Sequence, residues 1–183
     1  LPILGTSMVF SRSIFESGWI TKILRRSFIL FLCGVVLNHL SYVILFATTA
    51  DYSLHQCITD IVANFRPMGV LQRLAICFLI GSIIFRIINS RRLLFVLAVM
   101  LMLLSTFSYH WYSFTEPYSE TSNISIFIDQ LTLGTAHTYM QAPYDPEGLW
   151  GTINGVATVL LGTVAGLSIK RSYKRIFANA NHK

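Results

Sequence analysis

Long apolar runs alternate along the chain with shorter polar segments. This alternation divides the chain into candidate helices and the connections between them. Four of the runs have roughly the 20 apolar residues that a helix needs to cross a bilayer, and a fifth, at the start of the chain, has about half that length. The pattern predicts an all-α polytopic bundle of transmembrane helices, with four full spans and one truncated first span. The predicted spans cover residues 1–10, 27–50, 68–88, 93–111 and 149–169.

The polar segments carry most of the charge, and the two signs are separated. Lysine and arginine gather in 11–26, around 86–92 and in the tail 170–183, which are alternate connections and therefore share one side. Seven of the eight acidic residues lie in the other two connections, 51–65 and 112–148. Because basic loops stay in the cytoplasm, we expect a cytoplasmic tail at 170–183 and outer loops at 51–65 and 112–148.

The composition agrees with an integral membrane protein whose main partner is the lipid bilayer. Hydrophobic residues make up 54% of the chain and charged residues 12%, whereas about a quarter of the residues in soluble domains are charged. The net charge of +6 follows from the basic side and requires no nucleic acid, although it favours anionic lipid. Three separated cysteines form no CxxC pair, which argues against a metal site. The sequence leaves open whether the chain forms a homo-oligomer.

Two carboxylates, Asp145 and Glu147, stand directly before the last apolar run. In one interpretation Asp145 caps the helix, Pro146 occupies its first position and Glu147 faces the positive end of the helix dipole. In the other, the two carboxylates hold an amine or sugar hydroxyls, or orient a catalytic base. Spacing alone leaves both interpretations open.

The same run carries four glycines on one helix face, since they are spaced by 4, 7 and 4 residues. Small residues let neighbouring helices approach closely in lipid. We therefore predict tight helix packing along this face, with a narrow ligand channel as the alternative. The glycines are Gly151, Gly155, Gly162 and Gly166.

Arg66 and Arg73 are seven residues apart, so the start of the third span should carry both on one face. Pro67 suits the first turn of that helix, and Arg73 should lie about 10 Å deeper than Arg66. An arginine inside a span usually points into the protein interior. Two interpretations remain: an anion clamp, which Gln72 would also serve, or ion pairs with acidic partners. The candidate partners are Asp129, Asp145 and Glu147.

Three further polar side chains are candidates for function. Asn38 and His39 lie near the middle of the predicted span 27–50, where polar residues are functional candidates by default. A hydrogen bond between helices is the simpler explanation for them. His137 lies in the predicted outer loop, eight residues before Asp145, and can act as an acid or base near neutral pH.

Three ordered motifs are similar to the heparan-α-glucosaminide N-acetyltransferase family, which includes bacterial membrane homologues. Residues 66–74, RPMGVLQRL, resemble its G-V-L-Q-R element. Residues 128–137 resemble its I-D-R-x-x-L-G-x-x-H loop, although Gln130 stands where the family often has arginine. Residues 144–152, YDPEGLWGT, resemble the start of its D-P-E-G helix, and Gly5-Thr6-Ser7 resembles the end of its early helix.

This resemblance implies a transmembrane acyltransferase of a bacterial inner membrane, which transfers an acetyl group from cytoplasmic acetyl-CoA to an amino sugar on the outer side. It implies that Arg66, Gln72 and Arg73 contact the acyl donor or brace the outer site. The amino sugar would be positioned by Asp129, Asp145 and Glu147, with His137 as a catalytic helper.

Two further expectations concern completeness and rival functions. Because the chain opens at Leu1 inside apolar sequence, we expect a central fragment of a larger membrane domain, with the family's main catalytic histidine outside it. A transporter with the same outer acids, or a truncated inactive remnant that only packs, are the alternative functions.

Overall fold

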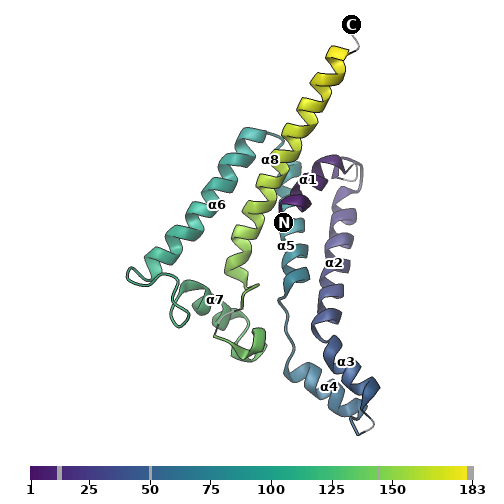
Figure 1. Cartoon of the computed structure of the whole chain (residues 1–183), viewed down its shortest axis with the longest axis vertical. Helices are drawn as coiled ribbons and strands as arrows, with labels where there is room; N and C mark the ends of the chain where they lie inside the picture. Colours follow the sequence, from purple (N-terminus) through teal and green to yellow (C-terminus); the bar gives the residue numbers. More distant parts are fainter. Residues whose placement is uncertain (12–13, 50, 144, 181–183) are drawn as a thin grey trace.

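The chain folds into a bundle of helices in the computed structural model, which describes residues 1–11, 14–49, 51–143 and 145–180 (Figure 1). All regular secondary structure in those residues is helical, as the apolar pattern predicts. Two short 3-10 turns, η2 and η3, cover Thr135–His137 and Tyr139–Gln141. The α-helices are α1 (Pro2–Phe10), α2 (Trp19–Asn38), α3 (Leu40–Thr48), α4 (Leu54–Ala63), α5 (Val70–Ile87), α6 (Arg91–Tyr112), α7 (Ile124–Thr132) and α8 (Leu149–Ala180).

Three of the described helices, α5, α6 and α8, are long and apolar enough to cross a membrane. The pair α2 and α3 also passes this test if the two helices count as one span, although they are bent by 46°. The predicted spans 68–88, 93–111 and 149–169 therefore each correspond to one helix. The last of these continues to Ala180, well into the segment predicted as a tail.

The predicted span 27–50 is divided between two helices, α2 and α3. Helix α2 begins at Trp19, inside the segment predicted as a connection, and ends at Asn38. In a regular helix the His39 N–H would bond to the Val35 carbonyl. Instead the His39 ring nitrogen Nδ1 lies 2.8 Å from that carbonyl oxygen, and the backbone N–H turns to Val36. A side chain inserted into the hydrogen-bond ladder is a common cause of a helix bend.

Both predicted outer loops contain helices. Segment 51–65 holds α4, whose first turn is fixed by a capping box between Ser53 and Gln56. Segment 112–148 holds α7, for which the Asn123 side chain accepts the N–H of Ile126. Both helices have 10 or fewer residues, so they lack the long period-3.6 pattern that marks a helix in sequence.

Helix α8 is the centre of the bundle and packs against α1, α5, α6 and α7. Its glycine face meets α1 at backbone distance: a Cβ on Gly162 would lie 2.0 Å from the Pro2 carbonyl oxygen. A Cβ on Gly155 would lie 2.6 Å from the Cys77 sulfur on α5. On the α6 side, Asn154 donates to the Ser105 hydroxyl at 2.9 Å. The predicted tight packing along the glycines is confirmed at these positions.

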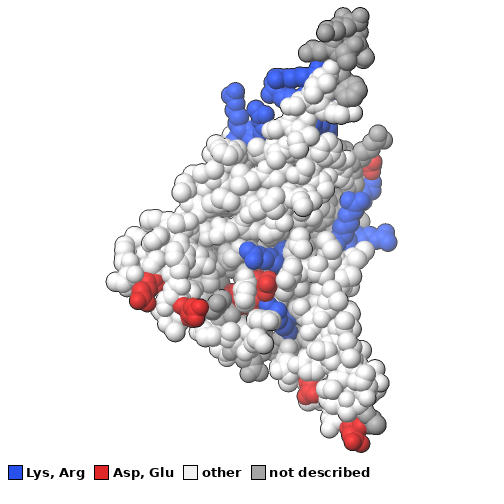
Figure 2. Space-filling model, in the orientation of Figure 1, with Lys and Arg blue, Asp and Glu red and all other residues white. Residues whose placement is uncertain are grey.

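Figure 2 shows how charged side chains are distributed over one face of the molecule. Lysine and arginine gather around the C-terminal end of α8 and at the edge beside α2, next to one acidic side chain, and most aspartate and glutamate side chains lie toward the opposite end. A mixed group, which contains both signs, lies in the middle of this face. The separation matches the alternation predicted from the sequence, and the mixed group marks the candidate site.

Candidate functional site

The site is built around the short extended segment that joins α4 to α5. Helix α5 begins at Val70 after an extended Gly69 (φ −169°), so Pro67 precedes the helix and the prediction that it forms the first turn is wrong. A Cβ on Gly69 would lie 2.7 Å from the Asn38 amide nitrogen. Glycine therefore lets the segment pass close to the end of α2.

Three side chains fix the backbone of this segment. The Arg66 N–H donates to His39 Nε2 and the Asn38 amide donates to the Arg66 carbonyl, both at 3.4 Å. His137 Nδ1 lies 2.6 Å from the Phe65 carbonyl oxygen, and the His39 ring stacks on the Phe65 ring with centroids 5.4 Å apart. The polar residues at 38, 39 and 137 thus position Arg66 through its backbone.

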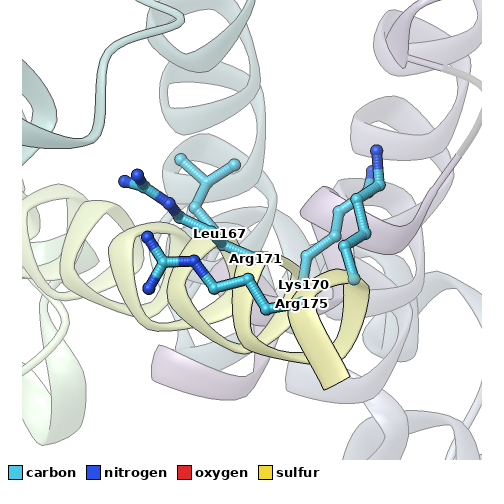
Figure 3. Close-up of a pocket in the computed structure, with 5 residues that line it drawn as sticks. Leu167, Lys170, Arg171 and Arg175 are labelled. Carbon is cyan, nitrogen blue, oxygen red and sulfur yellow. The ribbon is translucent and has the colours of Figure 1, made fainter. Parts of the chain in front are cut away.

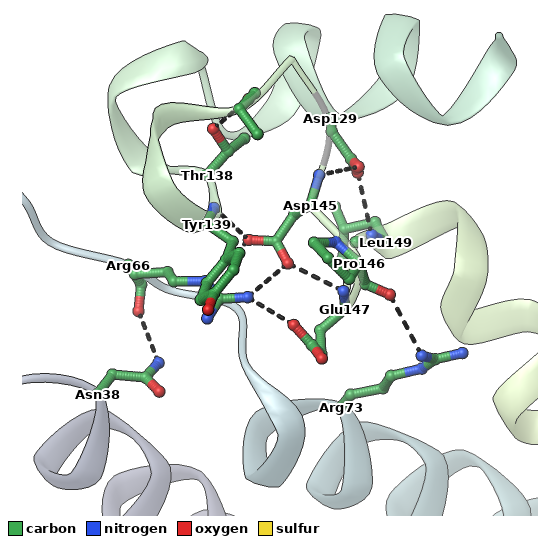
Figure 4. Close-up of polar contacts among 12 residues, drawn as sticks. Asn38, Arg66, Arg73, Asp129, Thr138, Tyr139, Asp145, Pro146, Glu147 and Leu149 are labelled. Carbon is green, nitrogen blue, oxygen red and sulfur yellow. Dashed lines mark hydrogen bonds and ion pairs between the residues drawn. The ribbon is translucent and has the colours of Figure 1, made fainter. Parts of the chain in front are cut away.

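The Arg66 side chain makes a bidentate ion pair with Asp145 (Figure 4). Its Nε donates to Asp145 Oδ2 at 2.9 Å, and Nη2 donates to Asp145 Oδ1 at 2.7 Å. Nη2 also reaches Glu147 Oε2 at 2.6 Å. The guanidinium lies over the Tyr139 ring, 4.7 Å from its centroid. The ion-pair interpretation is confirmed for Arg66, which is therefore not a clamp open to anions.

Burial and pairing act in opposite directions on Arg66. Burial lowers the pKa of its guanidinium, but hydrogen bonds and charge from Asp145 and Glu147 outweigh this and raise the pKa above its ordinary value. The Asp145 side chain is fully buried, whereas that of Glu147 is 22% exposed. Glu147 is consequently the carboxylate of the pair that a ligand reaches more easily.

Asp145 is saturated by protein donors and does not cap α8. Besides Arg66, its carboxylate accepts the backbone N–H groups of Tyr139 at 3.0 Å and Glu147 at 2.9 Å. Helix α8 begins four residues later, at Leu149. The prediction of Asp145 as N-cap, with Pro146 in the first helical position, is therefore wrong.

The carboxylate of Asp129 on α7 takes over the role of capping. Oδ1 accepts the N–H of Leu149 at 3.2 Å, and Oδ2 accepts the N–H of Asp145 at 3.1 Å. Burial raises the pKa of Asp129, although its two backbone hydrogen bonds act to lower it. A Cβ on Gly148 would lie 2.2 Å from Oδ2, so this approach requires glycine. Asp129 thus joins α7 to α8. Of the three candidate partners for the arginines, it forms no ion pair within the part of the chain that the structure describes.

Arg73 differs from Arg66 because its partners are neutral. It donates to the carbonyl oxygens of Gly151 at 2.8 Å and Pro146 at 3.4 Å. In the described part of the chain, no carboxylate lies within ion-pair distance of Arg73, and its buried Nε has no hydrogen-bond partner. The predicted ion pair is therefore not formed at Arg73, and the anion-clamp interpretation stays a prediction there.

Gln72 lies next to the site without contacting its charged groups. Its side chain is fully buried, and neither amide atom finds a hydrogen-bond partner among the described residues. It fits against Gly34, where a Cβ would lie 2.5 Å from its Oε1. Its role as a substrate contact stays a prediction.

A cavity of about 530 Å³ opens beside Arg66 and Tyr139. It lies between the α2–α3 bend and the segment of η3, and most of its lining consists of neutral hydrogen-bonding groups. Sequence reasoning missed most of these residues because they come from separate segments and share no period. The lining residues are Asn38, Ser41, Tyr42, Asn64, Arg66, Thr138, Tyr139 and Met140.

A smaller cavity of about 220 Å³ lies on the other side of Asp145 and Pro146. Tyr109, Glu120 and Ser125 contribute to its wall, and the Tyr109 and Ser125 hydroxyls bond to each other. No group of three or more histidine, cysteine, aspartate or glutamate side chains with metal-binding geometry occurs among the described residues. The polar chemistry is thus concentrated around Arg66 and Asp145.

A scan against protein-family models finds no match to the chain, and a search of curated proteins finds no similar sequence.

Proposed function

We propose that this chain forms part of an integral membrane acyltransferase that moves an acetyl group from cytoplasmic acetyl-CoA to an amino sugar on the outer side. The observation that carries the proposal is the 530 Å³ cavity beside the Arg66–Asp145 ion pair. This cavity is next to the segments predicted as outer loops, so the acceptor would reach it from outside. The resemblance to bacterial homologues supports an inner-membrane location.

The cavity has suitable chemistry for the hydroxyl groups of a sugar. The amides of Asn38 and Asn64 both donate and accept hydrogen bonds, and the Ser41 hydroxyl does the same. Tyr42 and Tyr139 add aromatic surface to the wall. Small-molecule sites commonly combine apolar or aromatic walls with a few polar groups that fix the orientation of the ligand.

The ion cluster has suitable charge for an amine. Arg66, Asp145 and Glu147 together carry a net charge of −1 when all three are ionised. This favours a cationic amino group over its neutral acetylated form by Coulomb attraction. We assign Glu147 as the amine contact because it is the more exposed carboxylate, and Asp145 as the residue that holds Arg66 in place.

Acetyl transfer joins the amine nitrogen to the thioester carbonyl carbon and breaks the carbon–sulfur bond. The bound ammonium first gives one proton to a base, which frees the nitrogen lone pair for attack. The second proton leaves the nitrogen after attack and passes to the departing thiolate of CoA. We assign Arg73 to the thioester oxygen, where negative charge develops, because its own charge has no carboxylate partner among the described residues. His137 is assigned as a helper in proton transfer, through the ring nitrogen opposite its bond to Phe65.

The test is acetyl transfer by the full-length protein reconstituted in vesicles. Acetyl-labelled acetyl-CoA is supplied on the tail side and glucosamine on the other, and we expect glucosamine to gain one labelled acetyl group. Arg73→Ala and Asp145→Asn should abolish the product, whereas Arg25→Gln, an exposed change on the opposite end, should not. Unchanged transfer by both site variants at equal protein levels would contradict the residue assignments.

A second candidate function, transport of the same sugar, is favoured by the α2–α3 bend. Discontinuous helices mark the substrate sites of many transporters, and this bend of 46° lies directly beside the cavity. A transporter would move labelled glucosamine across the vesicle membrane with its mass unchanged. An inactive remnant would show neither movement nor acetylation.

A further inference from the structure

A third cavity, an open groove of about 430 Å³, lies far from the Arg66 site at the C-terminal end of α8 (Figure 3). Leu167 contributes its apolar surface on the side of the bundle. Lys170 also reaches the end of α1, where it donates to the Val9 carbonyl at 3.3 Å. The remaining lining residues are Arg171, Lys174 and Arg175.

The four cations of this groove have no carboxylate partner within ion-pair distance in the described part of the chain. Glu16, the acidic residue of this end, is paired with Lys22. Lys170 and Lys174 are four residues apart, as are Arg171 and Arg175, so like charges face each other along the helix. This mutual repulsion favours an anionic ligand.

The opposite face of the same segment of α8 carries an exposed apolar stripe, because its residues lie about half a turn away from the groove residues. Ile169, Tyr173 and Ile176 follow at intervals of four and three residues and are 55%, 62% and 66% exposed. A helix segment with one apolar face and one basic face suits the boundary of an anionic membrane. The stripe therefore indicates that this level of α8 lies at the edge of the bilayer, where anionic headgroups reach the groove on the other face.

We propose that this groove binds the headgroup phosphate of an anionic phospholipid, with its acyl chains against Leu167. The arginines suit a phosphate group because their guanidinium groups donate two parallel hydrogen bonds. This site is separate from the acetyl-transfer site and depends only on the proposed insertion of the chain into a membrane. The lipid would fix the basic end of α8 at the cytoplasmic surface.

The proposal is tested by native mass spectrometry of the protein released from vesicles that contain equal phosphatidylglycerol and phosphatidylcholine. We expect selective retention of phosphatidylglycerol. Lys174→Gln/Arg175→Gln should weaken its binding by about 30-fold, from the usual contribution of two juxtamembrane cations. The control, Arg25→Gln/Arg92→Gln, removes the same charge from exposed positions outside the groove and should keep the selectivity.

Three results would overturn the lipid site. Equal retention of the two lipids would show that the cations select no headgroup. An equal loss in the control would show that general charge, rather than this groove, attracts the lipid. Release of phosphatidylglycerol by micromolar acetyl-CoA would assign the groove to a nucleotide phosphate. Carbonate extraction tests the membrane placement independently of the lipid site. If carbonate releases the protein from the membrane, the placement itself is refuted.

Discussion

At the scale of single residues, Asp129 combines two tasks that conflict electrostatically. Its oxygens satisfy the N–H groups of Asp145 and Leu149, yet full burial disfavours its negative charge and raises its pKa. Sequence reasoning assigned the cap to Asp145, the nearest acidic residue before the helix. No local pattern indicates that a carboxylate 20 residues earlier reaches the first N–H of α8.

We predict that the stability of the wild-type protein falls as the pH rises above about 4, the ordinary pKa of aspartate. A raised pKa means that the folded state binds more protons than the unfolded state in this window, so stability decreases with pH until the folded-state pKa is passed. Thermal unfolding in detergent, followed by tryptophan fluorescence, measures this slope. The slope should be smaller in Asp129→Asn, and an identical slope in both proteins would refute the assignment to Asp129.

We predict that Arg66→Lys destabilises the protein by about 1–3 kcal/mol, because lysine keeps the charge but not the bidentate geometry. One ammonium cannot reproduce the paired bonds to Asp145 and the bond to Glu147. Chemical denaturation of the purified variant measures the loss. Arg25→Lys is the matched control, since Arg25 is exposed and surface changes usually stay within about 0.5 kcal/mol. Equal effects of the two substitutions would contradict the structural role of the ion pair.

At the scale of secondary-structure elements, the glycines of α8 differ in what they contact. A Cβ at Gly162 would lie 2.0 Å from the Pro2 carbonyl oxygen, whereas the nearest atom to one at Gly151 is Arg73 Nη2 at 3.7 Å. We predict that Gly162→Ala separates α1 from α8 and costs about 2 kcal/mol or more, as overpacking does. Gly151→Ala should be neutral or stabilising by up to about 1 kcal/mol through helix propensity. Thermal unfolding of both variants measures the contrast, and similar melting temperatures would disprove it.

The elements show where sequence reasoning succeeds and where it fails. Long apolar runs predicted α5, α6 and α8 because length and hydropathy alone decide such helices. The bend at His39 depends on one ring inserted at Val35 and on the backbone of Arg66, which is 27 residues away. The sequence offered several acidic partners for Arg66, because opposite charge alone does not say which partner is close in space. Tertiary packing selects Asp145. Tertiary packing also brings together the residues that line the cavity, so the sequence did not predict them.

At the scale of the whole molecule, lysine and arginine are separated from most of the acidic residues along the bundle. Twelve of the 14 lysine and arginine residues belong to the segments of one end, together with a single acidic residue, Glu16. From the positive-inside rule we predict that the C-terminal end of α8 lies in the cytoplasm and the α6–α7 connection outside. The fold agrees with this arrangement because α8 brings the basic segment to the end opposite most of the acidic side chains.

We predict that a membrane-impermeant maleimide applied to intact cells labels Thr115→Cys but not Ser172→Cys. Both side chains are exposed, Thr115 in the α6–α7 connection and Ser172 near the end of α8, so only the membrane should distinguish them. The wild-type chain supplies the background, since Cys57 and Cys77 are buried and Cys33 lies in the apolar helix α2, where a charged reagent reacts poorly. Permeabilised cells should label both variants equally. Labelling of Ser172→Cys alone from outside would invert the orientation and place the Arg66 cavity on the side of acetyl-CoA, which would remove the acceptor from the proposed site.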